Sequence, residues 1–182
     1  PFDLISAKYL ISLNMKQIKI PSGEITNYPL LKYLASKKIK IILSTGMSNI
    51  SEIKNTIKLF KKFGAKDDDI SILHCNTSYP TPYKDVNLNV IESLYKEFKL
   101  NVGYSDHTSG IIAPVAAVAK GAMIIEKHFT LNKNLKGPDH STSLNPKEFA
   151  LMVKYIRDTE DSLGNKKKII TRSEFKNIKI VR

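Results

Sequence analysis

The sequence has little of what disulfide-bonded, membrane-spanning or exported proteins need. Its 182 residues include one cysteine, Cys75, which excludes an internal disulfide. No apolar run approaches the roughly 18 residues of a transmembrane helix. The first residues lack the basic, apolar and small-residue segments of a secretory signal. We therefore expect a cytoplasmic protein that has no membrane partner.

Acidic residues are scarce beside basic ones, with 17 Asp and Glu against 29 Lys and Arg and a formal net charge of +12. Clustered lysines bind nucleic acid by displacing counterions from phosphates. Here the lysines are spread over residues 37–40, 61–62 and 166–168, near the ends of expected helices, where the helix dipole favours them. No helix-turn-helix, zinc-finger or RNP-like pattern accompanies them. We expect no nucleic-acid partner, although the positive potential suits a small anionic substrate.

Strand and helix patterns alternate along the chain. Strands are expected at residues 17–20, 40–43, 70–74, 101–104 and 123–126. Helices are expected at residues 4–13, 29–36, 51–63, 90–98, 111–120 and 145–163, with Asp3 and Asn145 as caps. Such βα units predict a parallel sheet, either open or closed as a (β/α)8 TIM barrel.

Five strands are fewer than the eight of a closed barrel, which takes about 250 residues. We therefore expect residues 1–165 to form a partial TIM-barrel catalytic domain, made of its C-terminal five βα units. The first three strands are expected before Pro1. Residues 166–182 are expected to begin a linker to further chain.

Two histidines stand at matching points of successive strand-to-loop junctions. His107 follows the strand in residues 102–104, and His128 follows the strand in residues 123–126. In parallel α/β folds the carboxyl ends of strands carry the functional site. A metal ion or an anion shared by the two histidines is one hypothesis, and two unrelated loop histidines is the other.

The other strand ends also carry polar residues: Ser22 and Glu24, Ser44 and Thr45, Asn76 and Tyr79, and Ser105. Lys19 points into or out of the barrel according to strand parity. If it points inward, a lysine beside serines forms a receptor for phosphate or carboxylate. Cys75 is not expected to be a nucleophile activated by its neighbour His74, because adjacent strand residues face opposite ways. His140 is expected to donate a loop hydrogen bond rather than to bind a metal.

Six segments, in order, resemble the sialic acid synthase family, whose members condense phosphoenolpyruvate with N-acetylmannosamine or a related sugar. They are KIPSGE at residues 19–24, LSTGM at 43–47, YPTPY at 79–83, SDHT at 105–108, EKHFT at 126–130 and GPDH at 137–140. The resemblance extends from the first residues to about Leu163. It implies a TIM barrel, a C-terminal antifreeze-like domain after residues 166–182, and a domain-swapped homodimer.

The resemblance also implies roles for individual residues. His107 and His128 match divalent metal ligands for Mn²⁺ or Mg²⁺, and imidazole suits Mn²⁺ better. The matches to phosphoenolpyruvate-binding positions are Lys19, Ser22, Ser44, Asn76 and Ser105. Tyr79 and Asp139 match positions near the sugar, and Glu24 and Glu126 match carboxylates at the reacting centre. Glu24 could instead be a solvent-exposed turn residue, and Glu126 could orient His128 or pair with Lys127.

The implied activity is the condensation of phosphoenolpyruvate with N-acetylmannosamine to give N-acetylneuraminate and phosphate. The alternatives are a legionaminic acid synthase acting on a 2,4-diacetamido-trideoxy sugar, another metal-dependent aldolase or hydrolase, and a binding module without turnover. Relatives that make pseudaminic acid carry a bulky aromatic residue where Gly23 stands. Because Gly23 leaves that space open, it favours the sialic or legionaminic branch.

Overall fold

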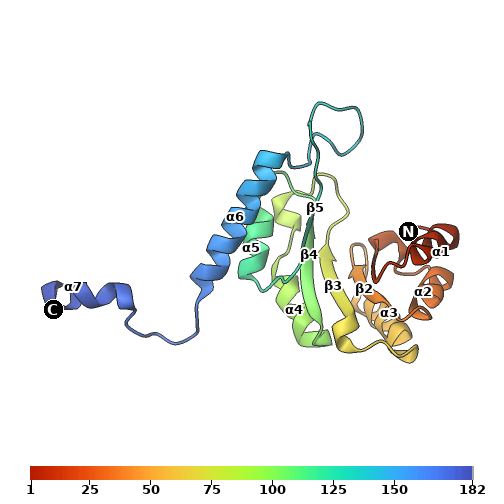
Figure 1. Cartoon of the computed structure of the whole chain (residues 1–182), viewed down its shortest axis with the longest axis horizontal. Coiled ribbons are helices and arrows are strands. Elements are labelled where there is room, and N and C mark those ends of the chain that lie inside the picture. The colour runs from red at the N-terminus through yellow and green to blue at the C-terminus, as the bar shows by residue number, and fades with distance from the viewer. Residues whose placement is uncertain (182) are drawn as a thin grey trace.

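The five strands form one parallel sheet in the order in which they occur along the chain. The computed structural model describes residues 1–181. The strands are β1 (Gln17–Ile20), β2 (Lys40–Ser44), β3 (Ile70–Cys75), β4 (Asn101–Asp106) and β5 (Ile125–Lys127). Each pairs in parallel with the next, so the sheet order is β1-β2-β3-β4-β5 (Figure 1). This half-barrel confirms the α/β prediction and matches five consecutive units of a TIM barrel.

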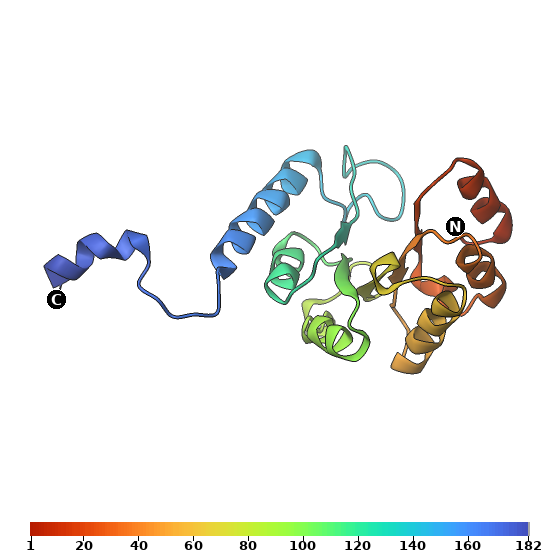
Figure 2. The same cartoon turned by 60° about the horizontal axis from the view of Figure 1, so that its bottom comes forward.

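Helices connect the strands and form an arc around the sheet (Figure 2). They are α1 (Leu4–Ser12), α2 (Tyr28–Ala35), α3 (Ile50–Lys62), α4 (Asn89–Phe98), α5 (Ile112–Ala119) and α6 (Pro146–Leu163). Asp3 accepts a 2.7 Å hydrogen bond from the Ser6 amide, as expected of a cap for α1. Asn145 caps α6 in a capping box with Glu148, with Pro146 in the first turn.

Alternation along the strands separates an apolar face from a polar one. Outward-facing residues of the first four strands pack beneath the helices and form the core: Ile18, Ile20, Ile41, Leu43, Ile70, Ile72, Val102 and Tyr104. Strand pairing places Cys75 beside Ser105, and Ser105 beside Glu126, on the other face. The sheet therefore presents polar side chains on its concave face.

The last two strands differ in their bounds from the sequence prediction. β4 continues to Asp106, and β5 begins at Ile125 rather than at Met123. The Met123 amide donates to the Val102 carbonyl at 2.8 Å, before the first residue pair of β4 and β5, which is Tyr104 with Ile125. A Cβ on Gly103 would lie 2.4 Å from the Ile124 carbonyl oxygen, so this close approach of two backbones requires glycine.

The chain after α6 leads away from the sheet (Figures 1 and 2). Part of the expected linker is helical, with a 3-10 turn at Arg172–Glu174 and α7 at Phe175–Val181. Phe175 is exposed there. Within residues 1–181 no helix combines the length and apolar character needed to cross a membrane.

Candidate active site

Curvature of the sheet lets side chains of its first and last strands meet across the concave face. The ammonium of Lys19, on β1, lies 3.0 Å from Oε1 of Glu126, on β5. The Ser105 hydroxyl donates to the same carboxylate oxygen at 2.7 Å. Lys19 therefore points inward, which resolves the parity that the sequence left open.

Glu126 is held as a carboxylate. Burial opposes its ionisation, but the Ser105 hydrogen bond and the Lys19 ammonium outweigh burial and lower the pKa of Glu126. Its expected alternative partner, Lys127, faces the other side of the sheet. The Lys127 ammonium contacts Asp106 there at 2.6 Å. Glu126 is thus available to the concave face.

Hydroxyl groups line the same face. Ser44 is fully buried, at 0% exposure, and its Oγ has no hydrogen-bond partner among residues 1–181. The Ser22 hydroxyl accepts from the Gly46 amide at 3.0 Å and keeps its own proton to donate. A buried hydroxyl without a partner is costly and rare in a folded protein, so within residues 1–181 Ser44 stands out as a donor that the protein leaves unused.

Cys75, on β3, lies on the concave face between β2, which carries Ser44, and β4, which carries Ser105. Burial raises the pKa of the Cys75 thiol, although the nearby Ser22 and Ser105 hydroxyls work in the opposite direction. A thiol kept protonated is a weak nucleophile. Its Sγ lies 3.8 Å from Nδ1 of His107, and His74 faces away and bonds to the Val86 carbonyl at 2.7 Å. These contacts agree with the expectation that Cys75 is not a nucleophile activated by His74.

His107 and His128 come together at the carboxyl end of the sheet. Their ring centroids are 5.2 Å apart and the rings are nearly perpendicular, at 80°. The Tyr79 ring lies 4.0 Å from the His107 ring and 5.4 Å from the His128 ring. The two histidines are therefore neighbours, as the hypothesis of a shared site requires.

The donor set suits a metal held by few protein ligands. His107 donates Nδ1–H to the Asn76 carbonyl at 2.6 Å, which leaves the Nε2 lone pair free. Burial lowers the pKa of His107, although the Asn76 bond opposes this, so the ring is in the neutral form that binds metals. The part of the chain that the structure describes has no cluster of three or more His, Cys, Asp or Glu arranged for a metal. His107 and His128 can therefore offer two imidazole nitrogens, and the described residues place no third group of these types with them.

A cavity of ≈ 290 Å³ opens beside the second histidine. It is lined by His128, Phe129, Pro138, Asp139, His140 and Ser143. Oδ2 of Asp139 lies 3.7 Å from Nδ1 of His128. Nδ1 of His140 forms a 2.8 Å hydrogen bond with the Thr130 hydroxyl, in agreement with its expected role in the loop. Asp139 thus contributes a carboxylate at the edge of the site.

Two candidate residues use their side chains locally. Oδ1 of Asn76 accepts from the Ser78 backbone amide at 2.8 Å, and the side-chain nitrogen Nδ2 lies 3.4 Å from the Asp85 carbonyl oxygen. Asn76 therefore contacts His107 through its backbone carbonyl and not through its side chain. Glu24 ends the 3-10 turn Ser22–Glu24 and accepts from the Asn27 side chain at 2.6 Å. Glu24 thus contributes to the turn between β1 and α2.

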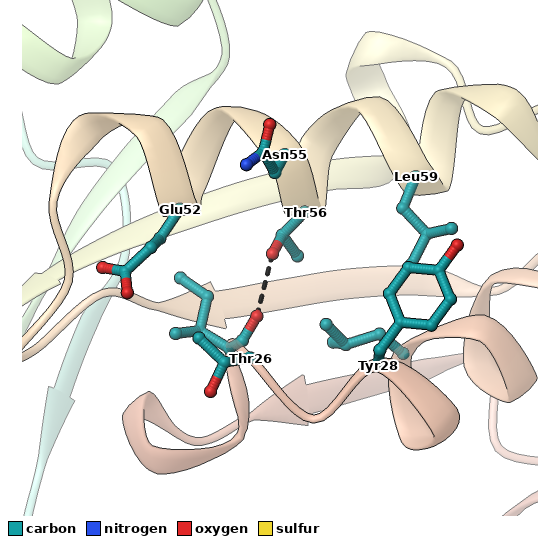
Figure 3. A pocket seen from close by; sticks show the side chains of 8 residues that line it. Thr26, Tyr28, Glu52, Asn55, Thr56 and Leu59 are labelled. Atoms are coloured by element: carbon teal, nitrogen blue, oxygen red, sulfur yellow. Dashed lines mark hydrogen bonds between the residues drawn. The ribbon is translucent and has the colours of Figure 1, made fainter.

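Another hollow lies on the helical side of the sheet, between α2 and α3 (Figure 3). Two of its polar side chains have hydrogen-bond partners. The Thr56 hydroxyl donates to the Ile25 carbonyl at 2.9 Å, and Glu52 accepts from the Asn49 amide in the capping box of α3. The lining residues include one carboxylate, Glu52, and no lysine or histidine, so we place the candidate site on the concave face.

Comparisons with known proteins identify relatives of the chain. The N,N'-diacetyllegionaminic acid synthase of Campylobacter jejuni is 53% identical over 182 residues, which are all of this chain and 54% of that protein. The pseudaminic acid synthase of the same species is 37% identical over 177 residues, 97% of this chain and 51% of that protein. The chain spans about half the length of these curated relatives.

A solved structure shows the same architecture. The N-acetylneuraminic acid synthetase of Leptospira borgpetersenii, in complex with citrate, superposes with a TM-score of 0.89 at 37% identity. The match covers 99% of this chain and 62% of that one. The model of the NeuB family matches residues 1–168, which include every strand and every candidate site residue. The chain therefore belongs to the NeuB family.

Proposed function

We propose that the protein condenses phosphoenolpyruvate with an acylated amino sugar, releasing phosphate. The observation that carries the proposal is the concave row of Lys19, Ser44, Ser105 and Glu126 beside His107 and His128. This row provides cationic and hydroxyl donors for an anionic substrate next to imidazoles that can hold a metal. A sugar and a phosphorylated enol are reactants with those needs.

Phosphoenolpyruvate is proposed to bind through Lys19 and the serine hydroxyls. Lys19 uses one contact for Glu126 and has further protons for a phosphate or carboxylate oxygen. Ser44 donates its unpartnered proton to the same ligand. Charge-assisted hydrogen bonds of this kind hold the enol in place for attack on the sugar aldehyde.

His107 and His128 are the residues that would hold Mn²⁺ or Mg²⁺. When bound, the ion would polarise the aldehyde of the open-chain sugar as a Lewis acid. The Asn76 carbonyl keeps the His107 proton on Nδ1, and the Tyr79 ring covers both imidazoles on one side. Oε1 of Glu126 is bound by Lys19 and Ser105. Its other oxygen, Oε2, accepts a hydrogen bond from the water that adds to the oxocarbenium-like carbon derived from phosphoenolpyruvate, and phosphate then leaves.

For the sugar we propose 2,4-diacetamido-2,4,6-trideoxymannose, with N,N'-diacetyllegionaminate as the product. The support is the 53% identity to an N,N'-diacetyllegionaminic acid synthase, compared with 37% identity to a pseudaminic acid synthase. N-acetylmannosamine is the second candidate, because the chain is also similar to an N-acetylneuraminic acid synthetase over nearly its whole length.

The test is product chemistry on the full-length protein. Inorganic phosphate is expected only when phosphoenolpyruvate, sugar and Mn²⁺ are present together. Phosphate release without sugar would indicate a hydrolase, and saturable binding without any release would indicate a binding module. Values of kcat/KM measured side by side for the diacetamido sugar and for N-acetylmannosamine decide between the two substrates.

A further inference from the structure

A buried ion pair joins the two residues that precede the histidines. The Lys127 ammonium lies 2.6 Å from Oδ2 of Asp106, and the two side chains are 1% and 0% exposed. Asp106 immediately precedes His107 at the end of β4, and Lys127 immediately precedes His128 at the end of β5. Since successive strand residues face opposite ways, the pair lies behind the face that Ser105 and Glu126 share.

The pair also fixes the turn that carries His107. Oδ1 of Asp106 accepts from the Thr108 amide at 3.0 Å and from the Tyr104 hydroxyl at 2.9 Å. Oδ2 accepts from the Thr108 hydroxyl at 3.1 Å, and the Lys127 ammonium donates to the Thr108 carbonyl. The residues on both sides of His107 are therefore bound to the strand that carries His128.

Backbone hydrogen bonds hold the histidines from their loop side. The His107 carbonyl accepts from the Thr81 amide at 2.9 Å, and the His128 carbonyl accepts from the Leu144 amide at 2.9 Å. These contacts fix His107 to the loop after β3 and His128 to the end of the loop before α6. The Asp106–Lys127 pair is a side-chain link from one histidine-bearing strand to the other.

Stability alone is a weak reason for such a pair. Removing two charges from water is costly, and replacing both partners of a buried ion pair by uncharged groups of similar size is often neutral or stabilising. We propose that Asp106 and Lys127 are positioning residues that set the spacing of His107 and His128. This proposal rests on the proposed function for its chemical consequence, because the spacing of the imidazoles decides how well they share a metal.

The test is the double variant Asp106→Asn/Lys127→Met in the full-length protein. It removes both charges together, and the asparagine Oδ1 can still accept from the Tyr104 hydroxyl and the Thr108 amide. The matched control is Asp158→Asn/Lys154→Met, which makes the same chemical change in an exposed pair 2.5 Å apart on α6. Circular dichroism first establishes that both proteins are folded.

The first measurement is NMR of histidine-labelled protein without metal. The ring signals of His107 and His128 are expected to shift and their mutual cross-relaxation to weaken, whereas those of His140, bound to the Thr130 hydroxyl, remain. The second is Mn²⁺ titration, with an expected 10- to 100-fold loss of affinity, as is typical when groups that orient metal ligands are removed. In turnover assays at saturating Mn²⁺, kcat is expected to fall while the KM for phosphoenolpyruvate stays within about twofold, because Lys19 and Ser44 are unchanged.

A folded double variant with wild-type ring signals and wild-type Mn²⁺ affinity would overturn the proposal. If the double variant does not fold, Lys127→Arg decides. It keeps the charge but replaces the compact ammonium by a wider planar group, and unchanged ring signals in that variant also overturn the proposal. A wild-type protein that neither binds Mn²⁺ nor condenses the substrates would contradict the proposed function only, because the metal-free ring signals still decide the positioning role.

Discussion

Lys19 and Glu126 lie 3.0 Å apart, although their strands are the two edges of the five-stranded sheet. A flat sheet would separate its first and fifth strands by about 19 Å, since neighbouring strands are about 4.8 Å apart. The contact therefore depends on the curvature of the half-barrel. It also means that the charge of Lys19 acts on a carboxylate at the opposite edge of the sheet.

The first prediction concerns stability in acid. The pKa of Glu126 in the folded protein lies below its ordinary value of 4.5, so the unfolded chain binds more protons as the pH falls. The resulting stability is present above about pH 4.5 and is lost as the pH falls through the lowered pKa. Lys19→Met is expected to reduce this pH dependence, because it removes the ammonium that favours the ionised form.

The measurement is urea unfolding of wild type and Lys19→Met between about pH 3 and 7. Lys61→Met is the control, since Lys61 is 2.5 Å from Asp67 in an exposed pair far from the concave face. Lys61→Met is expected to leave the acid slope unchanged. Equal slopes in wild type and Lys19→Met would contradict the coupling between Lys19 and Glu126.

The second prediction uses the unpartnered hydroxyl of Ser44. Ser44→Ala is expected to maintain or raise the free energy of unfolding, by up to about 1 kcal/mol, because it removes a buried group without a hydrogen bond. The same variant is expected to raise the KM for phosphoenolpyruvate about 10-fold or more, as a hydrogen bond to a charged ligand is worth about 1.5–3 kcal/mol.

The matched control for Ser44 is Ser71→Ala, at a buried serine near the opposite end of the sheet. It is expected to leave the KM for phosphoenolpyruvate unchanged. Thermal unfolding and steady-state kinetics on the three proteins measure both effects. A Ser44→Ala protein that loses stability but keeps its KM would show that the hydroxyl has a structural role and no ligand.

The fold and the meeting of the histidines could be predicted from the sequence because both follow from periodicity. Strands that alternate with helices predict a parallel sheet, and adjacent strands place their carboxyl ends side by side. His107 and His128, which each follow a strand end directly, therefore meet.

Other features depend on tertiary geometry. The direction of Lys19 requires the strand parity, and its pairing with Glu126 requires the curvature of the sheet. No local sequence pattern contains the Asp106–Lys127 ion pair, because its partners come from different strands. The later start of β5 follows from the backbone approach at Gly103, which depends on how two strands pack.

The third prediction tests the metal ligands. His107→Ala and His128→Ala are each expected to abolish turnover and Mn²⁺ binding in the full-length protein while it stays folded, because both rings lie at strand ends outside the apolar core. His140→Ala is the control, since its ring bonds to Thr130 in the loop. It is expected to keep Mn²⁺ affinity within a few-fold. Near-normal activity and metal binding in either of the first two variants would exclude the pair as the metal site.

The last prediction concerns the sugar and Gly23. A Cβ built on Gly23 meets no atom within 4 Å, so a side chain can leave the backbone there without a clash at its first atom. Gly23 lies between Ser22 and Glu24 in a turn beside the concave face, and a ring at that position would occupy space that the proposed sugar uses.

Gly23→Phe is therefore expected to keep its melting temperature within a few degrees of the wild type. It is expected to lower kcat/KM for 2,4-diacetamido-2,4,6-trideoxymannose about 10-fold or more, as differences in pocket shape of about 1–3 kcal/mol allow. Activity with the altrose isomer is expected to suffer less, because the family resemblance implies an aromatic residue at this position in enzymes that make pseudaminic acid. Gly23→Ala is the matched control, with kcat/KM within about threefold of wild type. If Gly23→Phe turned over both sugars as the wild type does, Gly23 would have no part in the choice of substrate, and the selectivity would have to lie in the cavity beside His128 and Asp139.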